Sequence, residues 1–232
     1  MTDMRLTADL NIKDLKVFGN AIGTIDAQVA NESASLYNAD VKLSGFDNNM
    51  ALKGSYDTAA GSFNADVNIQ ALQMTSIQGF SMNQLRDAKG FISGNLKVSG
   101  TTKNPSIIGG LKFNDAGFGV TQLNSTFQNM NDEISFTQRG IEFNSFKIND
   151  TDGNALTING AVLTKTYQDF NFGLNITARD FKVVNSTKSN NQILYGVMAI
   201  NANIGIKGDM NLPKIDGTIT VTDKTDFTFV LP

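Results

Sequence analysis

The chain has 232 residues, a net charge of -3 and a pI of about 4.9, and it contains neither histidine nor cysteine. Without these residues a Ser-His-Asp relay, a thiol nucleophile, a disulfide framework and the common zinc sites are excluded. The acidic balance and the lack of a basic stripe argue against nucleic-acid binding.

Apolar and polar residues alternate along most of the chain, which is typical of β-strands with one apolar face. In the first half the alternating apolar residues are Leu6, Ala8, Leu10, Ile12, Val41, Leu43, Phe63, Ala65, Val67, Ile69, Leu96 and Val98. In the second half they are Ile134, Phe136, Ile141, Phe143, Phe146, Ile148, Leu156, Ile158, Phe170, Phe172, Leu174, Ile176, Ile204, Ile206, Phe227, Phe229 and Leu231. Strand and turn signals that recur about every 8 to 12 residues predict roughly 16 to 20 strands.

Two helix starts interrupt this pattern. Ser81 and Gln84 have the spacing of a capping box, which predicts a short helix near 81–88. Ser189 and Gln192 repeat the box, but the residues around them favour a weaker second helix. We therefore expect one or two short helices in an otherwise all-β chain.

A strand-turn-strand pattern occurs twice, with every matched pair 108 positions apart. Its members pair in order as Leu96 with Ile204, Val98 with Ile206, Gly100 with Gly208, Pro105 with Pro213, Ile107 with Ile215, Gly109 with Gly217, Leu111 with Ile219 and Phe113 with Val221. The pattern predicts a β-hairpin with a Gly/Pro turn and contains no catalytic group. We interpret residues 1–232 as one continuous repeat-built segment, with copies at about 41–120 and 146–222, taken from a longer chain.

Two carboxylate clusters are more typical of ordinary turns than of a metal site or an acid/base pair. Asp150–Asn154 has the opening spacing of a calcium loop, but Ala155 stands at the required glycine and Ala161 at the bidentate glutamate. Asp132–Glu133 are adjacent, so on a strand they would point to opposite faces. We predict no catalytic residue, no bound metal and no cofactor, and therefore not an enzyme.

One sheet of this many strands cannot stay flat with one face apolar. At about 4.8 Å per strand it would run roughly 80 to 95 Å, and it must curl or fold over to cover the apolar face. Two outcomes remain open at this point, a closed sandwich and an open trough.

The pattern from Gly94 to Gly117 resembles the recurring signature of the AsmA-like and TamB proteins. The downstream runs Phe146–Asp150, Gly153–Leu156 and Phe170–Ala178 resemble it as well. Phe181–Thr187, followed by Leu194-Tyr195-Gly196, is similar to the carboxy-terminal region of TamB, especially its Bacteroidetes-type version. The resemblance covers about residues 60–232.

This resemblance implies a mostly antiparallel, long, curved sheet that forms a U-shaped groove with an apolar interior, a β-taco. Such proteins are anchored in the inner membrane of diderm bacteria and span the periplasm. They are thought to carry phospholipid towards the outer membrane. TamB also pairs with an outer-membrane barrel of the Omp85 class, TamA or a relative.

The leading hypothesis is therefore a periplasmic segment of a lipid-transfer protein, which binds phospholipid and no nucleic acid. The alternative is a structural module whose sheet edge pairs with outer-membrane β-barrel proteins or an Omp85-class partner. The predicted groove residues, all expected on one concave face, are Leu96, Val98, Ile107, Leu111, Phe113, Ile141, Phe143, Leu156, Ile158, Phe170, Phe172, Leu174, Ile176, Ile204, Ile206, Ile215, Ile219 and Val221.

Overall fold

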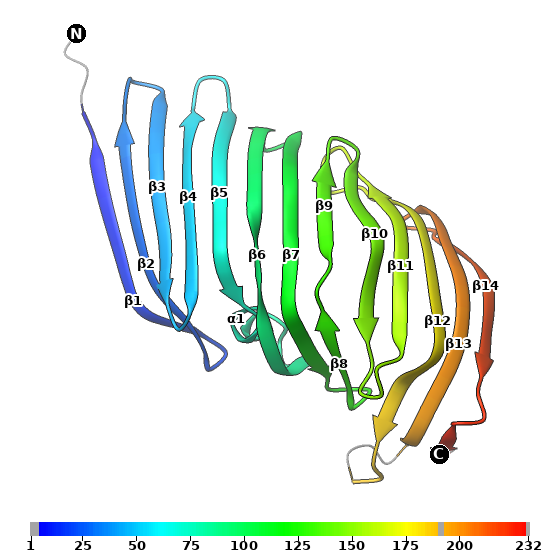
Figure 1. The fold of residues 1–232 in the computed structure, drawn as a ribbon. Helices are drawn as coiled ribbons and strands as arrows, with labels where there is room; N and C mark the ends of the chain where they lie inside the picture. The colour runs from blue at the N-terminus through cyan, green and yellow to red at the C-terminus, as the bar shows by residue number, and fades with distance from the viewer. Residues whose placement is uncertain (1–4, 190–192, 231–232) are drawn as a thin grey trace.

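A computed structural model describes residues 5–189 and 193–230. The described residues form one 15-stranded sheet and one short helix, α1 (Met74–Gly79) (Figure 1). The first strands are β1 (Thr7–Val17), β2 (Asn20–Asn31), β3 (Leu36–Gly45), β4 (Asn48–Asp57), β5 (Ser62–Gln73), β6 (Leu85–Thr101), β7 (Pro105–Val120) and β8 (Ser125–Met130). The others are β9 (Glu133–Thr137), β10 (Gly140–Asn149), β11 (Ala155–Leu163), β12 (Asn171–Ser186), β13 (Leu194–Asp209), β14 (Lys214–Val221) and β15 (Asp226–Phe229).

Nearly every strand pairs with the next strand in the chain, and all pairs are antiparallel. β8 and β9 together take one place in this order, because both pair with β7 on one side and β10 on the other. β15 returns to pair with β13. The predicted all-β, antiparallel, curved sheet is confirmed, with slightly fewer strands among the described residues than the turn signals indicated.

A single row of opposed residues crosses the whole sheet. In register order the row is Ile12, Ile25, Leu43, Met50, Ile69, Gly94, Leu111, Ile134, Phe143, Gly160, Leu174, Ile206 and Ile215. Every member is apolar or glycine. Because directly opposed residues share a face, the apolar sides of all these strands form one surface.

The sheet curves towards this apolar surface, as α1 demonstrates. Ser76 of α1 donates a hydrogen bond to the carbonyl of Ala21 on β2 at 3.2 Å, and Gln78 Oε1 accepts one from the amide of Ala88 on β6 at 2.9 Å. In a flat sheet β2 and β6 would lie about 19 Å apart, at 4.8 Å per strand. A six-residue helix is only about 9 Å long. The sheet therefore bends around α1, with the apolar face inside.

Bulged residues with positive φ recur along the strands and help to bend them. Asp14, Asp87, Asp115, Ser145 and Asp180 have φ between 44° and 54°, which few side chains other than those of Asp and Asn adopt readily. Three bulge amides donate to an asparagine Oδ1 at 2.8 Å: Asp115 to Asn131 between β8 and β9, Ser145 to Asn159 on β11, and Asp180 to Asn201 on β13. Part of the asparagine content of this chain thus satisfies amides that the bulges leave unpaired.

The predicted helix over 81–88 is wrong, because the helix ends before it. Ser81 Oγ donates to the carbonyl of Gln78 at 2.7 Å and accepts the amide of Leu85 at 3.0 Å, so it closes a turn instead of capping a helix. Strand β6 begins at Leu85. The second capping box reaches into residues 190–192, which lie outside the described residues.

Buried Asn48 holds α1 in its place. Its Nδ2 donates to the carbonyl of Ile22 and to Ser76 Oγ, both at 2.8 Å, and its Oδ1 accepts the amide of Gln73 at 2.7 Å. Met74 and Ile77 of α1 pack against the apolar face of the sheet. The helix is thus part of the interior. Among the described residues, no helix has the length and hydropathy to cross a bilayer.

The two strand-turn-strand patterns fold as the β6–β7 and β13–β14 hairpins, as predicted. Their backbones correspond in detail. Gly109 and Gly217 have φ of 140° and 145°, a conformation that L side chains rarely adopt. The repeat therefore preserves a backbone requirement as well as an apolar pattern.

Candidate apolar groove

The strand register places the predicted groove residues on one face of the sheet. All of them except Phe170 lie in strands, and each belongs to the apolar row or to an adjacent row on the same side. Phe170 immediately precedes β12. Sequence alternation alone is sufficient to choose these residues, because a strand has only two faces.

The exposure of these residues differs from that of a closed core. Ile215, Ile219 and Val221 on β14 are each more than half exposed, and the other predicted groove residues are half-buried. β14 is exposed because it is the last strand of the main path. The described residues supply no second layer that covers this face, apart from α1 and the loop described below.

Fully buried apolar residues lie around α1 and also on β11 to β13, away from α1. The fully buried apolar residues are Ile22, Leu43, Ile69, Met74, Ala88, Ile92, Ala116, Met130, Phe146, Ala161, Phe181, Val184, Ala199 and Ala202. Several of these share a row with predicted groove residues: Ile92 is opposed to Phe113, Phe146 to Ile158, and Ala202 to Ile219. The apolar face thus combines these fully buried residues, called the packed floor below, with a half-exposed apolar surface.

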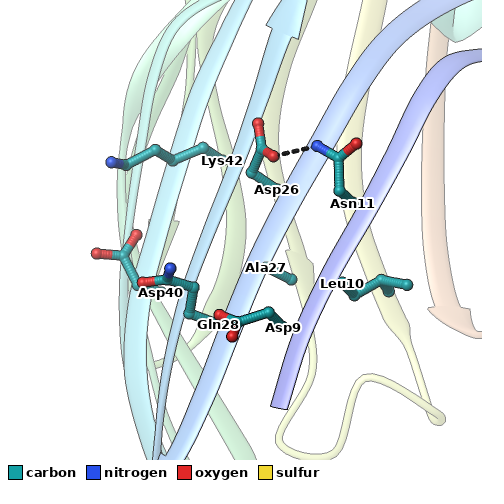
Figure 2. Close-up of a pocket in the computed structure, with 8 residues that line it drawn as sticks. All are labelled: Asp9, Leu10, Asn11, Asp26, Ala27, Gln28, Asp40 and Lys42. Atoms are coloured by element: carbon teal, nitrogen blue, oxygen red, sulfur yellow. Dashed lines mark hydrogen bonds between the residues drawn. The ribbon is translucent and has the colours of Figure 1, made fainter. Parts of the chain in front are cut away.

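The opposite face of the sheet is polar. Figure 2 shows Asn11 and Asp26 hydrogen-bonded across β1 and β2, with Lys42 of β3 projecting away from the sheet, while Leu10 and Ala27 project from the other side. The hollow in this view is lined mostly by charged and amide side chains. It is therefore part of the solvated outer face.

The loop 164–170 between β11 and β12 reaches the start of β7. Tyr167 of this loop lines a hollow of about 240 Å³ together with Pro105, Ile107 and Thr137. Burial raises the pKa of its phenol, whose oxygen has no hydrogen-bond partner among the described residues. The loop covers the end of the groove that lies opposite α1, a feature that no sequence signal predicted.

The sequence interpretation also missed half of the groove. The apolar rows continue into β1 to β5 and include Leu10, Ile12, Ile25, Ala27, Val29, Val41, Met50, Leu52 and Val67, and further on Ile134, Phe136 and Val162. Most of these show the period-2 signal. The residues from Leu10 to Leu52 precede residue 60, where the family resemblance begins.

Residues 144–232 match the family model of the TamB C-terminal domain. This segment is similar to the TamB family and is called the TamB domain below. The match begins within β10 and continues through β15, so it lies inside the stretch over which the sequence resembles TamB. The Bacteroidetes-type assignment stays a prediction. No curated protein and no solved structure matches the chain.

The floor of the TamB domain and the strands before it are rich in paired aromatic rings. Phe146 packs edge-on against Phe113 and Phe143, with ring centroids 5.1 and 6.1 Å apart. Phe181 stacks on Phe127 of β8 at 5.6 Å. Phe113 and Phe143, both predicted groove residues, therefore also support the packed floor.

The first turn of the TamB domain is organised by one buried carboxylate. Asp150 Oδ1 accepts the amides of Asp152 and Asn154, both at 2.9 Å, and its Oδ2 accepts Asn154 Nδ2 at 3.0 Å and the Lys182 amide at 2.8 Å. Desolvation alone would raise the pKa of Asp150, but these donors outweigh it and lower the pKa. Asp150–Asn154 is thus a turn, as the sequence favours. Across residues 5–189 and 193–230 no cluster of three or more Asp or Glu residues could hold a metal ion.

Proposed function

We propose that the apolar groove binds phospholipid acyl chains and shields them from water as lipid moves between the inner and outer membranes. The observation that carries this proposal is the unbroken apolar row, which crosses the sheet on a mostly half-buried face that, among the described residues, only α1 and the loop 164–170 cover in part. We further propose that the chain is a binding module and not an enzyme.

The dimensions of the row suit acyl chains better than a compact ligand. Thirteen opposed residues at about 4.8 Å per strand span roughly 60 Å, which is about twice the hydrocarbon thickness of a bilayer. Acyl chains gain about 25 cal/mol for each Å² of apolar surface removed from water, and this gain needs no polar pocket. Lipids with different headgroups should therefore bind alike.

We base the proposed setting of this activity on the family match. The TamB C-terminal domain supports a role in a translocation and assembly module or in lipid transport. We place the segment in the periplasm, within a longer protein that is anchored in the inner membrane. An Omp85-class, TamA-like barrel is the proposed outer-membrane partner.

One observation favours a second candidate function, in assembly. Among the described strands β14 pairs only with β13, and all eight of its residues are exposed. Its free edge could add a strand of an outer-membrane β-barrel protein or of the Omp85-class partner. In that case the groove would be structural, and lipid would not need to enter it.

Photocrosslinking at two neighbouring positions separates these functions. Phe172 is half-buried on the apolar face, whereas Asn171 is exposed on the outer face of the same strand. A photoreactive residue at Phe172 should label phospholipid in cells, and the same residue at Asn171 should not. Equal labelling of lipid from both positions, or none from either, would contradict the lipid-binding proposal. Transfer of label to a barrel protein from β14 alone would favour assembly.

A further inference from the structure

Four large apolar side chains stand exposed together at one rim of the sheet. Phe18 is 67% exposed, Phe46 54%, Phe80 63% and Met82 73%. We call these four residues the rim patch. None of them belongs to the apolar rows of the groove, because all four lie in turns.

These turns are held together by α1. Gln73, just before the helix, donates from Nε2 to the carbonyl of Asp47 in the β3–β4 turn at 3.0 Å. Gln78 donates from Nε2 to Asn20 Oδ1 at the β1–β2 turn at 3.3 Å. Phe80 and Met82 directly follow α1, which Figure 1 places at the same end of the sheet as these two turns. The rim patch is therefore one region of the surface.

Three members of the patch have an unfavourable backbone conformation. Phe18, Phe46 and Met82 have φ of 46°, 51° and 51°, and each precedes a second residue with positive φ. Two-residue turns of this kind prefer Asn, Asp or Gly at the first position, because a bulky side chain is strained there. The chain thus places large apolar residues at positions where Asn, Asp or Gly would cause less backbone strain. Such a local conflict is expected at functional sites.

The size and charge of the patch decide what it contacts. From the exposed fractions above and about 200 Å² for a large side chain, it offers roughly 500 Å². A stable protein interface buries about 800 Å² on each partner, so a second copy of the chain is a poor fit. The turn segments 18–20, 45–48 and 79–84 carry one carboxylate, Asp47, and no cation. The turn segments themselves therefore offer no cation to attract anionic lipid.

We propose that the rim patch inserts into the interface of a zwitterionic lipid bilayer. Separate turn tips can enter a fluid interface independently, to a depth of about 5 to 10 Å, where apolar side chains leave water and the polar turn backbone stays hydrated. This contact does not rest on the proposed function. It holds the strand ends near α1 at a membrane surface whether or not the groove binds lipid.

A single tryptophan can report the insertion, because the chain has no Trp. In the full chain, Phe46→Trp should shift its emission to shorter wavelength on adding phosphatidylcholine vesicles, and brominated phosphatidylcholine should quench it. Leu212→Trp is the matched control, since Leu212 is 73% exposed in the β13–β14 turn at the opposite rim. The control should neither shift nor be quenched. Equal quenching of both tryptophans, or of neither, would overturn the proposal.

A triple variant separates binding from folding. Phe18→Asn, Phe46→Asn and Met82→Asn place a favoured residue at each strained position, so thermal unfolding should occur at the same or a higher temperature. Vesicle partitioning should nevertheless fall at least tenfold, and for the unchanged chain it should be independent of salt. Unchanged partitioning of the triple variant would refute the proposal. So would binding to anionic vesicles alone, or crosslinking of the patch to a protein in place of lipid.

Discussion

Replacing Leu174 by Asp tests whether the apolar face is an open groove. Leu174 lies in the row between Gly160 and Ile206, and is half-buried. Full burial of a leucine stabilises by about 1.5 to 3 kcal/mol, so the loss here should be about 1 to 2 kcal/mol. The new carboxylate can stay hydrated. For a chain of this size the melting temperature should fall by about 2 to 8 °C.

Phe181→Asp is the matched control on the same strand and the same face. Phe181 is 2% exposed and stacked on Phe127. Loss of a buried phenylalanine costs about 3 to 5 kcal/mol, and an unpaired buried carboxylate adds several more. The sum is comparable with the whole stability of a domain, about 5 to 15 kcal/mol, so this variant should not fold.

The assay combines thermal unfolding with lipid binding. Both variants are heated under circular dichroism, and the folded ones are then incubated with a fluorescent phospholipid. Leu174→Asp should fold and bind much less lipid, because acyl chains would meet a hydrated charge. If it unfolds as completely as Phe181→Asp, the face is a closed core. If it folds and binds lipid normally, the groove does not hold the acyl chains.

Two further changes test the sheet and its first TamB turn. Gly160→Ala should destabilise by about 1 to 3 kcal/mol, because φ is 111° and the new Cβ would lie 2.1 Å from the Gly173 carbonyl oxygen. Gly173→Ala is the control, since its Cβ would meet no atom closer than 3.6 Å, and equal urea midpoints for the two variants would contradict this. The second test changes the pH and measures the contribution of Asp150 to stability. Because the pKa of Asp150 is lowered by folding, its stabilisation is present above the unfolded value of about 3.9 and is lost as pH falls through the folded value. Urea midpoints should therefore drop more steeply below about pH 4 for the unchanged chain than for Asp150→Asn, and parallel curves would show that Asp150 does not contribute.

The sheet and the composition of its apolar face could be predicted because they depend on local periodicity. A residue such as Leu174 is assigned to a face by its position in an alternating strand, and antiparallel neighbours then align the faces of all strands. The same reasoning places Ile206 and Ile215 on the apolar side of the sheet together with Leu174. No long-range information was needed for this part.

The packed floor and the helix could not be predicted, because both depend on where strands bend. Met74 and Ile77 become interior only because the sheet curves around α1, and Ser81 forms a turn because β6 begins four residues later. The bulge at Asp180 is satisfied by Asn201, which lies 21 residues away. Nothing in the local sequence indicates such a partner.

The unbroken row has a consequence for how this architecture can change in length. Most hairpins contribute two opposed residues to the row and pair with their sequence neighbours. Inserting or deleting one hairpin would therefore lengthen or shorten the groove by about 10 Å and leave every other strand pair intact. The two copies 108 residues apart are what duplication by such units would leave behind. The number of hairpins therefore sets the length of the groove in this fold.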